Sequence, residues 1–165
     1  MQTASEEKKS GAWLPPRWFI RSAWAVHRRL YKMTGGRFGL RRAKGDGWGM
    51  ARLTTVGRRT GQERSVMIGY FEDGPDIVTL AMNGWGEGEP AWWLNLQAHP
   101  DATLELADGR RSVVGHAAEG EERARLWDRW CQIDEKTDDF AARRPGETAV
   151  VVLEPRLHGS ASAAE

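Results

Sequence analysis

The chain has 165 residues, of which 40% are hydrophobic, 28% are charged and one is a cysteine. This length favours a single domain with an ordinary core, and the composition is that of a soluble globular protein. No apolar stretch approaches the roughly 18 residues of a membrane span, and the charged N-terminus lacks a secretory signal, so we expect a cytoplasmic protein. The single cysteine excludes an intramolecular disulfide framework and any multi-cysteine metal site.

The net charge of +1 conceals an uneven distribution of charge along the chain. Residues 1–64 carry 15 Lys and Arg against 4 Asp and Glu, whereas residues 65–165 carry 9 against 19. The basic excess predicts a negatively charged partner: phosphates, a polycarboxylate, nucleic acid or an anionic membrane. The alternative is that the two parts of the chain simply attract one another in the fold. Nine tryptophans are also unusual, because such large rings fill a core, an interface or a ligand pocket.

The N-terminal part of the chain is predicted to be a disordered tail (1–12) followed by a basic helix and linker (13–49). Between Arg17 and Met33 the apolar residues share one side of a helix, and arginine and lysine side chains form a stripe on the other. This amphipathic helix is expected to lie against an anionic membrane, against the mouth of a binding pocket or on the domain itself. Residues 156–165 are predicted to be a second disordered tail.

From residue 50 to residue 155 the pattern is that of a β domain. The runs MARLTTV, RSVMIGYF and DIVTLAM predict a three-stranded meander, with Glu72–Pro75 as the turn between the last two strands. ATLELA and RRSVVGHAA flank Asp108-Gly109, a strong hairpin signal, and TAVVVLEP is the closing strand.

Short helices are predicted over 89–98, where a proline fits the first turn, and over 120–132. Six strands connected mainly through turns, with helices at the side, predict a mainly β protein. The expected architecture is an antiparallel β-barrel, not a parallel doubly wound sheet.

The densest chemistry lies in the run TTVGRRTGQER, residues 54–64. Its glycines let the backbone approach an anion, its three arginines supply fork-shaped donors and its threonines add hydroxyl groups. It is neither a Walker loop nor a dinucleotide fingerprint, because the GxxxxGK[ST] and GxGxxG spacings are absent. From these residues alone, a phosphate cradle and a solvated basic turn are equally supported.

Other candidate sites are weaker. The four histidines are scattered without ligand spacing, so we predict no metal site. Cys131 lies on the apolar side of its predicted helix and is expected to be a small buried residue, not a reactive thiol. Asp138 and Asp139 could form a carboxylate pair, but adjacent acidic residues more often solvate a loop. No nucleic-acid recognition module is evident.

The runs MTGGRFGLRR, MARLTTVGRRTGQERSV, PAWWLNLQAHPDATLELADG, GEERARLWDRW and AVVVLEP, in this order, resemble the deazaflavin-dependent nitroreductase family over about residues 27–155. The resemblance implies a six-stranded split β-barrel related to the flavin reductase and pyridoxamine-phosphate-oxidase barrels. It further implies that reduced coenzyme F-420 binds in a groove and passes a hydride to an apolar acceptor such as a quinone or an activated alkene. A non-catalytic barrel that carries a deazaflavin or flavin is the alternative, and FMN is the second candidate cofactor.

Carried over by position, the family's contacts with the phosphate and oligoglutamate chain of the coenzyme fall in the arginine-rich run. The ring contacts fall at the end of the strand DIVTLAM and at the start of the following helix, where N–H groups suit the polar edge of the ring. The coenzyme-binding residues that the resemblance implies are Arg58, Arg59, Thr60, Gly61, Arg64, Ser65, Met67, Leu80, Ala81, Met82, Asn83, Ala91, Trp92, Trp93, Asn95 and Thr137. For Trp92, ordinary core packing is the alternative. No residue is assigned a catalytic role, because hydride transfer from a deazaflavin depends on geometry more than on an acid–base pair.

The chain departs from the family's pattern at positions expected near the ring or before the last strand: Met67, Met82, Asn83, Thr137, Phe140 and Arg144–Gly146. The methionines make the expected pocket floor more apolar. The tyrosines of members that reduce nitroimidazoles are missing, so we expect a quinone to react faster than a nitro compound. The expected partners are this small-molecule acceptor and, through the basic helix, an anionic membrane surface; the expected assembly is a monomer or a homodimer.

Overall fold

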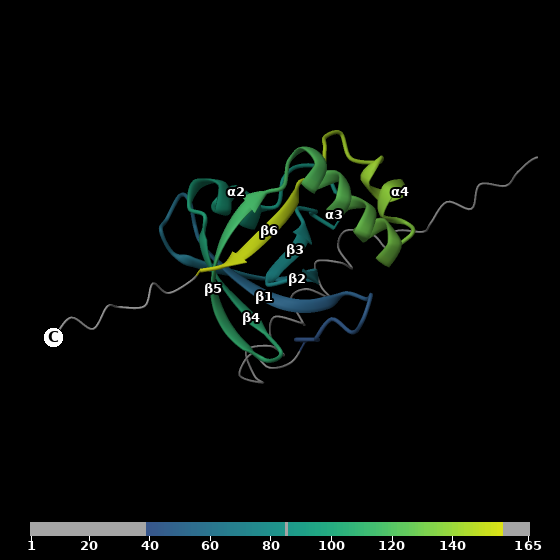
Figure 1. Cartoon of the computed structure of the whole chain (residues 1–165). Coiled ribbons are helices and arrows are strands. Elements are labelled where there is room, and N and C mark those ends of the chain that lie inside the picture. Colours follow the sequence, from purple (N-terminus) through teal and green to yellow (C-terminus); the bar gives the residue numbers. More distant parts are fainter. Residues whose placement is uncertain (1–38, 85, 157–165) are drawn as a thin grey trace, which may run out of the picture. The chain divides into compact units, whose positions relative to one another are not determined.

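The structure, a computed structural model, describes residues 39–84 and 86–156. The predicted N-terminal tail, the amphipathic helix and residues 157–165 of the C-terminal tail lie outside the described residues. The six strands of the described part form one closed barrel (Figure 1). They are β1 (Gly49–Val56), β2 (Glu63–Asp73), β3 (Asp76–Leu80), β4 (Asp101–Leu106), β5 (Gly109–Ala117) and β6 (Val150–Pro155).

Every pair of neighbouring strands is antiparallel, and the order around the barrel is β1-β2-β3-β6-β5-β4. The predicted meander of the first three strands and the six-stranded antiparallel barrel are therefore confirmed. β1 shows why the sequence folds this way: its residues alternate strictly between buried and half-buried, so one face enters the core. At the β2–β3 turn, Gly74 takes a φ of 63°, which other residues rarely adopt.

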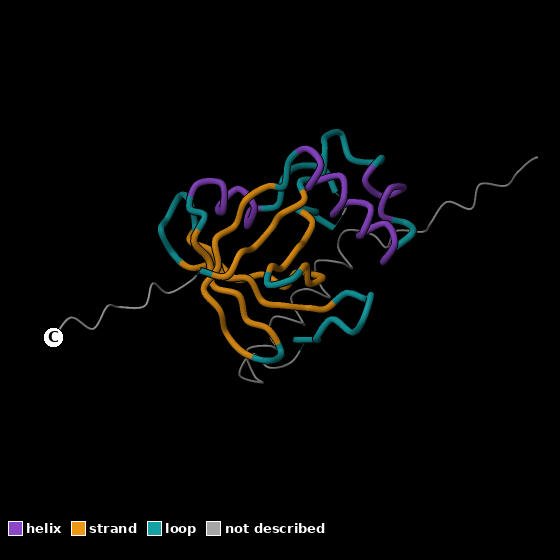
Figure 2. Tube along the Cα trace, viewed as in Figure 1, coloured by secondary structure: helices purple, strands orange, loops and turns teal. Residues whose placement is uncertain are grey.

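The helices of the described part lie on one side of the strands in the view of Figure 2. They are α2 (Ala91–Ala98), α3 (Gly120–Ile133) and α4 (Thr137–Ala141). The first two were predicted. The third was not, because Asp138 and Asp139 were expected in a loop; they lie in the first turn of α4, where the carboxylate of Asp138 accepts a hydrogen bond from the Trp127 indole at 2.7 Å.

Two clusters of buried side chains form the core. The inner cluster fills the barrel and includes Leu53, Leu104 and, from α2, Trp92 and Leu96. α2 lies close to β5 because Gly115 has no side chain: a Cβ there would lie 2.9 Å from a methyl carbon of Leu96.

The outer cluster lies between α3 and the other face of the sheet, where the rings of Phe71 and Trp130 meet edge to face at 5.3 Å. The barrel thus holds α2 against its inner cluster and α3 against its outer one.

Candidate functional site

The arginine-rich run forms the turn between β1 and β2. The turn closes on itself, since the N–H of Gly57 donates to the carbonyl of Gln62 at 2.8 Å and the N–H of Gly61 donates to the carbonyl of Gly57 at 2.7 Å. A Cβ on Gly57 would lie 2.9 Å from that carbonyl of Gln62, and Gly61 has a φ of 66°. Both positions therefore favour glycine, and the closed turn leaves the side chains of Arg58 and Arg59 exposed.

The turn is fastened to α2 through Asn95, which is 4% exposed. The side-chain oxygen of Asn95 accepts hydrogen bonds from the main-chain N–H of Arg58 at 3.2 Å and from its Nη1 at 3.3 Å. The amide nitrogen of Asn95 donates to Oγ1 of Thr55 at 3.2 Å. Two residues assigned to the coenzyme from the sequence, Arg58 and Asn95, are thus in direct contact.

The described arginines of the basic N-terminal part fall into two groups. Arg42 pairs with Asp108 at 2.8 Å, the Nε of Arg52 donates to Glu105 at 2.8 Å, and the guanidinium of Arg41 lies 4.1 Å from the ring centre of Trp48. By contrast, the arginines of the β1–β2 turn and its flank form no ion pair with any described residue: Arg58, Arg59 and Arg64. Part of the basic excess is therefore neutralised within the fold, and the part on the turn is available to an external anion.

Two further predicted residues lie on the outer face of β2, next to this turn. The hydroxyls of Ser65 and Thr54 are hydrogen-bonded at 2.8 Å across the β1–β2 pair. Met67 is half-exposed and lies opposite Arg52. Both predicted side chains point away from the inner cluster, which receives Ile68 and Tyr70.

The predicted ring segment lies in the β3–α2 loop (residues 81–84 and 86–90). β3 ends at Leu80, two residues earlier than predicted, because the N–H of Met82 turns back to the carbonyl of Leu80 at 2.8 Å. Leu80 and Ala81 are buried, in the outer and inner clusters respectively, and Met82 packs partly against the outer one. Asn83 is exposed, so it and the half-exposed Met82 are the members of this set with side chains open to a ligand.

At the start of α2 the two predicted tryptophans are core residues. Trp92 is 8% exposed and Trp93 is 5% exposed, and their rings meet edge to face at 6.4 Å. Their indoles therefore belong to the inner cluster, as the core-packing alternative for Trp92 expected. No side chain caps this helix, and the N–H groups of Trp93 and Leu94 donate to the carbonyl of Pro90. Among the described residues this leaves the N–H groups of Ala91 and Trp92 for the acceptor atoms of a ligand.

Thr137 lies apart from the other predicted residues in the chain, at the start of α4, and is 1% exposed. α4 packs on α3. Phe140, in the same helix, stacks with the guanidinium of Arg143 at 5.2 Å. Thr137 is buried and Phe140 has no hydroxyl, so neither residue replaces the tyrosines of the members that reduce nitroimidazoles.

The structure adds a residue that the sequence analysis noted only as a departure from the family's pattern. Arg144 is 8% exposed and donates from Nη1 to the carbonyl of Ala81 at 2.9 Å and from Nη2 to the carbonyl of Gly88 at 2.9 Å. No local signal distinguishes it from the exposed Arg143, because its partners lie 63 and 56 residues away in the chain.

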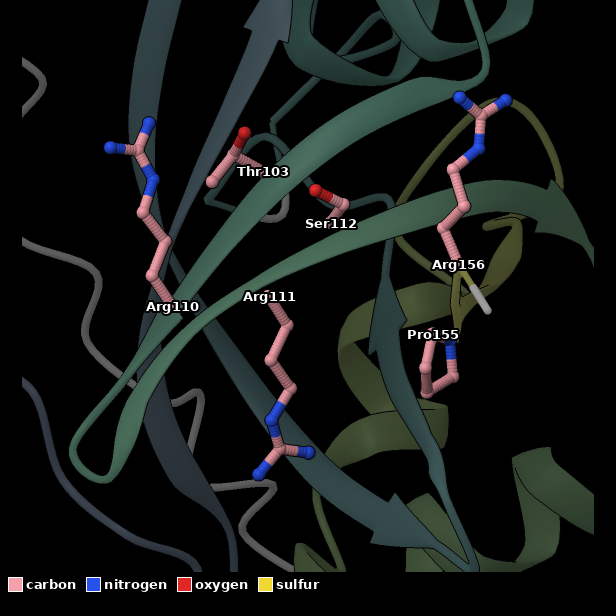
Figure 3. Close-up of a pocket in the computed structure, with 6 residues that line it drawn as sticks. All are labelled: Thr103, Arg110, Arg111, Ser112, Pro155 and Arg156. Atoms are coloured by element: carbon pink, nitrogen blue, oxygen red, sulfur yellow. The ribbon is translucent and has the colours of Figure 1, made fainter. Parts of the chain in front are cut away.

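A depression of about 570 Å³ lies on the β4–β5 hairpin and the end of β6. Figure 3 shows the hydroxyls of Thr103 and Ser112 between the side chains of Arg110 and Arg156, with Arg111 extending to the other side of the hairpin. Arg156 is paired with Asp101 at 2.7 Å. None of the lining residues belongs to the predicted coenzyme set, although Thr103 is the strand partner of Thr54.

Three other features of the described residues bear on chemistry. Burial, and then the neighbouring Asp138, raise the pKa of the Cys131 thiol to about 11, so this thiol is protonated at neutral pH. Within residues 39–84 and 86–156, no group of three or more His, Cys, Asp or Glu side chains could hold a metal ion. In the same ranges, no helix combines the length and apolar character that a bilayer span requires.

Comparison with known proteins identifies the family. The sequence model described as "F420H(2)-dependent quinone reductase" matches residues 24–155. F420H(2)-dependent quinone reductase Rv1261c of Mycobacterium tuberculosis is 31% identical over 104 residues, which are 62% of this chain and 68% of that protein.

Two solved structures share the fold. One, described as a domain-swapped dimer, has a TM-score of 0.62 and 22% identity, and the match covers 85% of this chain and all of that one. The other, the F420-H2 dependent reductase FDR-A, has a TM-score of 0.58 and 22% identity over 64% of this chain and 93% of that one. The chain belongs to the F420H(2)-dependent quinone reductase family, a split-barrel family of oxidoreductases that use the reduced deazaflavin coenzyme F-420.

Proposed function

We propose that this protein transfers a hydride from reduced coenzyme F-420 to a quinone, with activated alkenes as a second class of acceptor. Family membership supports the reductase activity and the quinone. The observation that carries the proposal is the group of three exposed arginines without carboxylate partners among the described residues, on and beside a turn that Asn95 fastens to α2. Family membership also disfavours a carrier without turnover.

The residues present fit an anionic coenzyme. The arginines of the turn would hold its phosphate and carboxylate groups, with the hydroxyl of Thr60 and the backbone at Gly61 beside them. The β3–α2 loop and the first N–H groups of α2 would hold the polar edge of the ring. When bound, the reduced coenzyme supplies the hydride.

The chain's own residues would position the ring. Trp92 and Trp93 are almost fully buried in the inner cluster, so they hold the start of α2 in place beneath the proposed ring site. The half-exposed thioethers of Met67 and Met82 present apolar surface to an acceptor. This surface favours a quinone over a polar nitro compound.

The experiment compares ligands and acceptors side by side. Quenching of tryptophan fluorescence would be titrated with F-420, FMN, haem and NADPH, and the oxidation of reduced F-420 would be followed with menadione and with a nitroimidazole. We expect F-420 to bind in preference to FMN and menadione to be reduced faster. Fast nitro reduction without quinone reduction would overturn the acceptor class, and tight F-420 binding without turnover would favour the carrier.

We also propose that residues 17–33, which lie outside the described residues, contact an anionic membrane. Basic side chains near such a surface contribute about 1 kcal/mol each, and salt screens them. Flotation with anionic and neutral liposomes at low and high salt tests this. Binding should need anionic lipid and disappear when residues 1–33 are deleted; no flotation under any condition rules it out.

A further inference from the structure

Arg144 brings a positive charge into the protein interior. Its side chain is 3% exposed, and its nearest carboxylate, Glu89 at 3.6 Å, is itself partly exposed. Its Nε has no hydrogen-bond partner among the described residues. Burying a guanidinium without full compensation is unfavourable, and an apolar side chain of similar size would often be at least as stable. Core stability alone therefore does not account for an arginine here.

The contacts of Arg144 connect two ends of one segment. Nη1 donates to the carbonyl of Ala81 at 2.9 Å, at the start of the β3–α2 loop, and to Oγ1 of Thr148 at 2.7 Å. Nη2 donates to the carbonyl of Gly88 at 2.9 Å, near the end of that loop. One rigid guanidinium thus fixes the separation of two main-chain carbonyls seven residues apart.

The loop needs such a fastening because of its composition. Gly84 and Gly88 have φ values of 56° and 80°, and their side-chain positions have open space around them. Glycine-rich backbone samples many conformations, so the loop alone would not hold one of them. Apart from the contacts of Arg144, the two ends of the loop are held by main-chain bonds, from the N–H of Ala81 to the carbonyl of Ala149 at 2.9 Å and from the N–H groups of Trp93 and Leu94 to the carbonyl of Pro90. Between these ends, the described bonds are local: Met82 N–H to the Leu80 carbonyl, Gly86 N–H to the Asn83 carbonyl at 2.9 Å and Asn83 Nδ2 to the Glu87 carbonyl at 3.4 Å.

We infer that Arg144 is a positioning residue for the coenzyme: it holds the β3–α2 loop so that Met82, Asn83 and the start of α2 present one fixed surface to the deazaflavin ring. The inference rests on the proposed function. It assigns no contact between Arg144 and the coenzyme, because its side chain is buried behind the loop.

The test replaces Arg144 by lysine, which keeps the positive charge but cannot donate to three acceptors in a fixed fork. We expect the affinity for F-420 to fall roughly tenfold, since charge-assisted hydrogen bonds are among the strong ones. We also expect kcat with menadione to fall, and amide hydrogen exchange to increase in residues 81–90 while that of β1 is unchanged.

The matched control is Leu106→Ala, a buried substitution beside the β4–β5 turn that destabilises the barrel without touching Arg144. At a temperature where both variants remain folded, only the lysine variant should lose coenzyme affinity and loop protection. Equal affinity in the two variants would show that Arg144 is merely structural.

A second variant decides the matter if Arg144→Lys does not fold. Glu89→Gln removes only the partly exposed carboxylate of the ion pair and should weaken F-420 binding roughly two- to fivefold. Unchanged binding would overturn the inference. Failure of the parent protein to bind F-420 would instead contradict the proposed function, so the two failures are distinguishable.

Discussion

Asn95 of α2 receives two hydrogen bonds from one residue of the β1–β2 turn, the main-chain N–H of Arg58 at 3.2 Å and its guanidinium at 3.3 Å. The amide group thereby couples the position of an arginine to that of a helix. The buried end of this connection is Thr55, whose hydroxyl accepts from the Asn95 amide. The turn and the helix therefore form one unit.

We expect Asn95→Ala to lower the free energy of unfolding by about 1–3 kcal/mol, because buried partners are left without hydrogen bonds. It should also weaken F-420 binding, since the turn is released from α2. Urea unfolding and fluorescence titration measure the two effects. The control is Gln97→Ala on the exposed side of α2, which should stay within about 0.5 kcal/mol of the parent.

Removal of the turn arginines should act on binding and not on stability. Arg59→Ala or Arg64→Ala should weaken F-420 binding by roughly ten- to a hundredfold, because each removes charge-assisted hydrogen bonds to an anion. Arg110→Ala is the control, since Arg110 is also exposed and forms no ion pair with a described residue. If both turn variants bind like the parent, the cradle is wrongly assigned.

At Gly49, the first residue of β1, the main chain of residues 41–43 packs too closely to leave space for a side chain. A Cβ there would lie 2.5 Å from the carbonyl oxygen of Arg41 and 2.7 Å from the main-chain nitrogen of Ala43. Main-chain atoms cannot move aside cheaply, so Gly49→Ala should destabilise the protein by about 1–3 kcal/mol. Gly146→Ala, where nothing lies within 4 Å, should leave the unfolding midpoint almost unchanged. Equal stability of the two variants would contradict the close packing of residues 41–43 against Gly49.

Cys131 should be a slow nucleophile. With a pKa of about 11, roughly one thiol in a thousand is ionised at pH 8, so alkylation by iodoacetamide should be slow and should accelerate up to about pH 11. Asp138→Asn removes a carboxylate that raises this pKa and should speed alkylation at pH 8. Asp139→Asn, in the same turn of α4, is the control. Rapid alkylation of the parent at pH 8 would contradict the raised pKa.

The strands could be predicted because each signal is local. β1 alternates along its whole length, and Asp108-Gly109 marks the β4–β5 turn by itself. α4 could not, since five residues are too few for an apolar period to be recognised.

The residues of the candidate site were likewise predictable only where their signal is local in the sequence. The arginines of the turn could be recognised as a run, whereas their contact with α2 was not predicted: the family resemblance only assigned both segments to the coenzyme. The hydrogen bonds of Arg144 to the β3–α2 loop could not be predicted from the sequence, because its three partners belong to different parts of the chain. Nothing in the neighbouring residues reveals which of two adjacent arginines is turned inward.

The position of β6 in the barrel determines the order in which folding can be completed. This strand is the last of those in the described part of the chain, yet it lies between β3 and β5 and pairs with both. Until residue 155 has left the ribosome, the nascent chain has two unpaired sheet edges, which are templates for pairing with other chains. We therefore expect the barrel to close only after synthesis of this domain ends, and the emerging domain to need protection from aggregation until then.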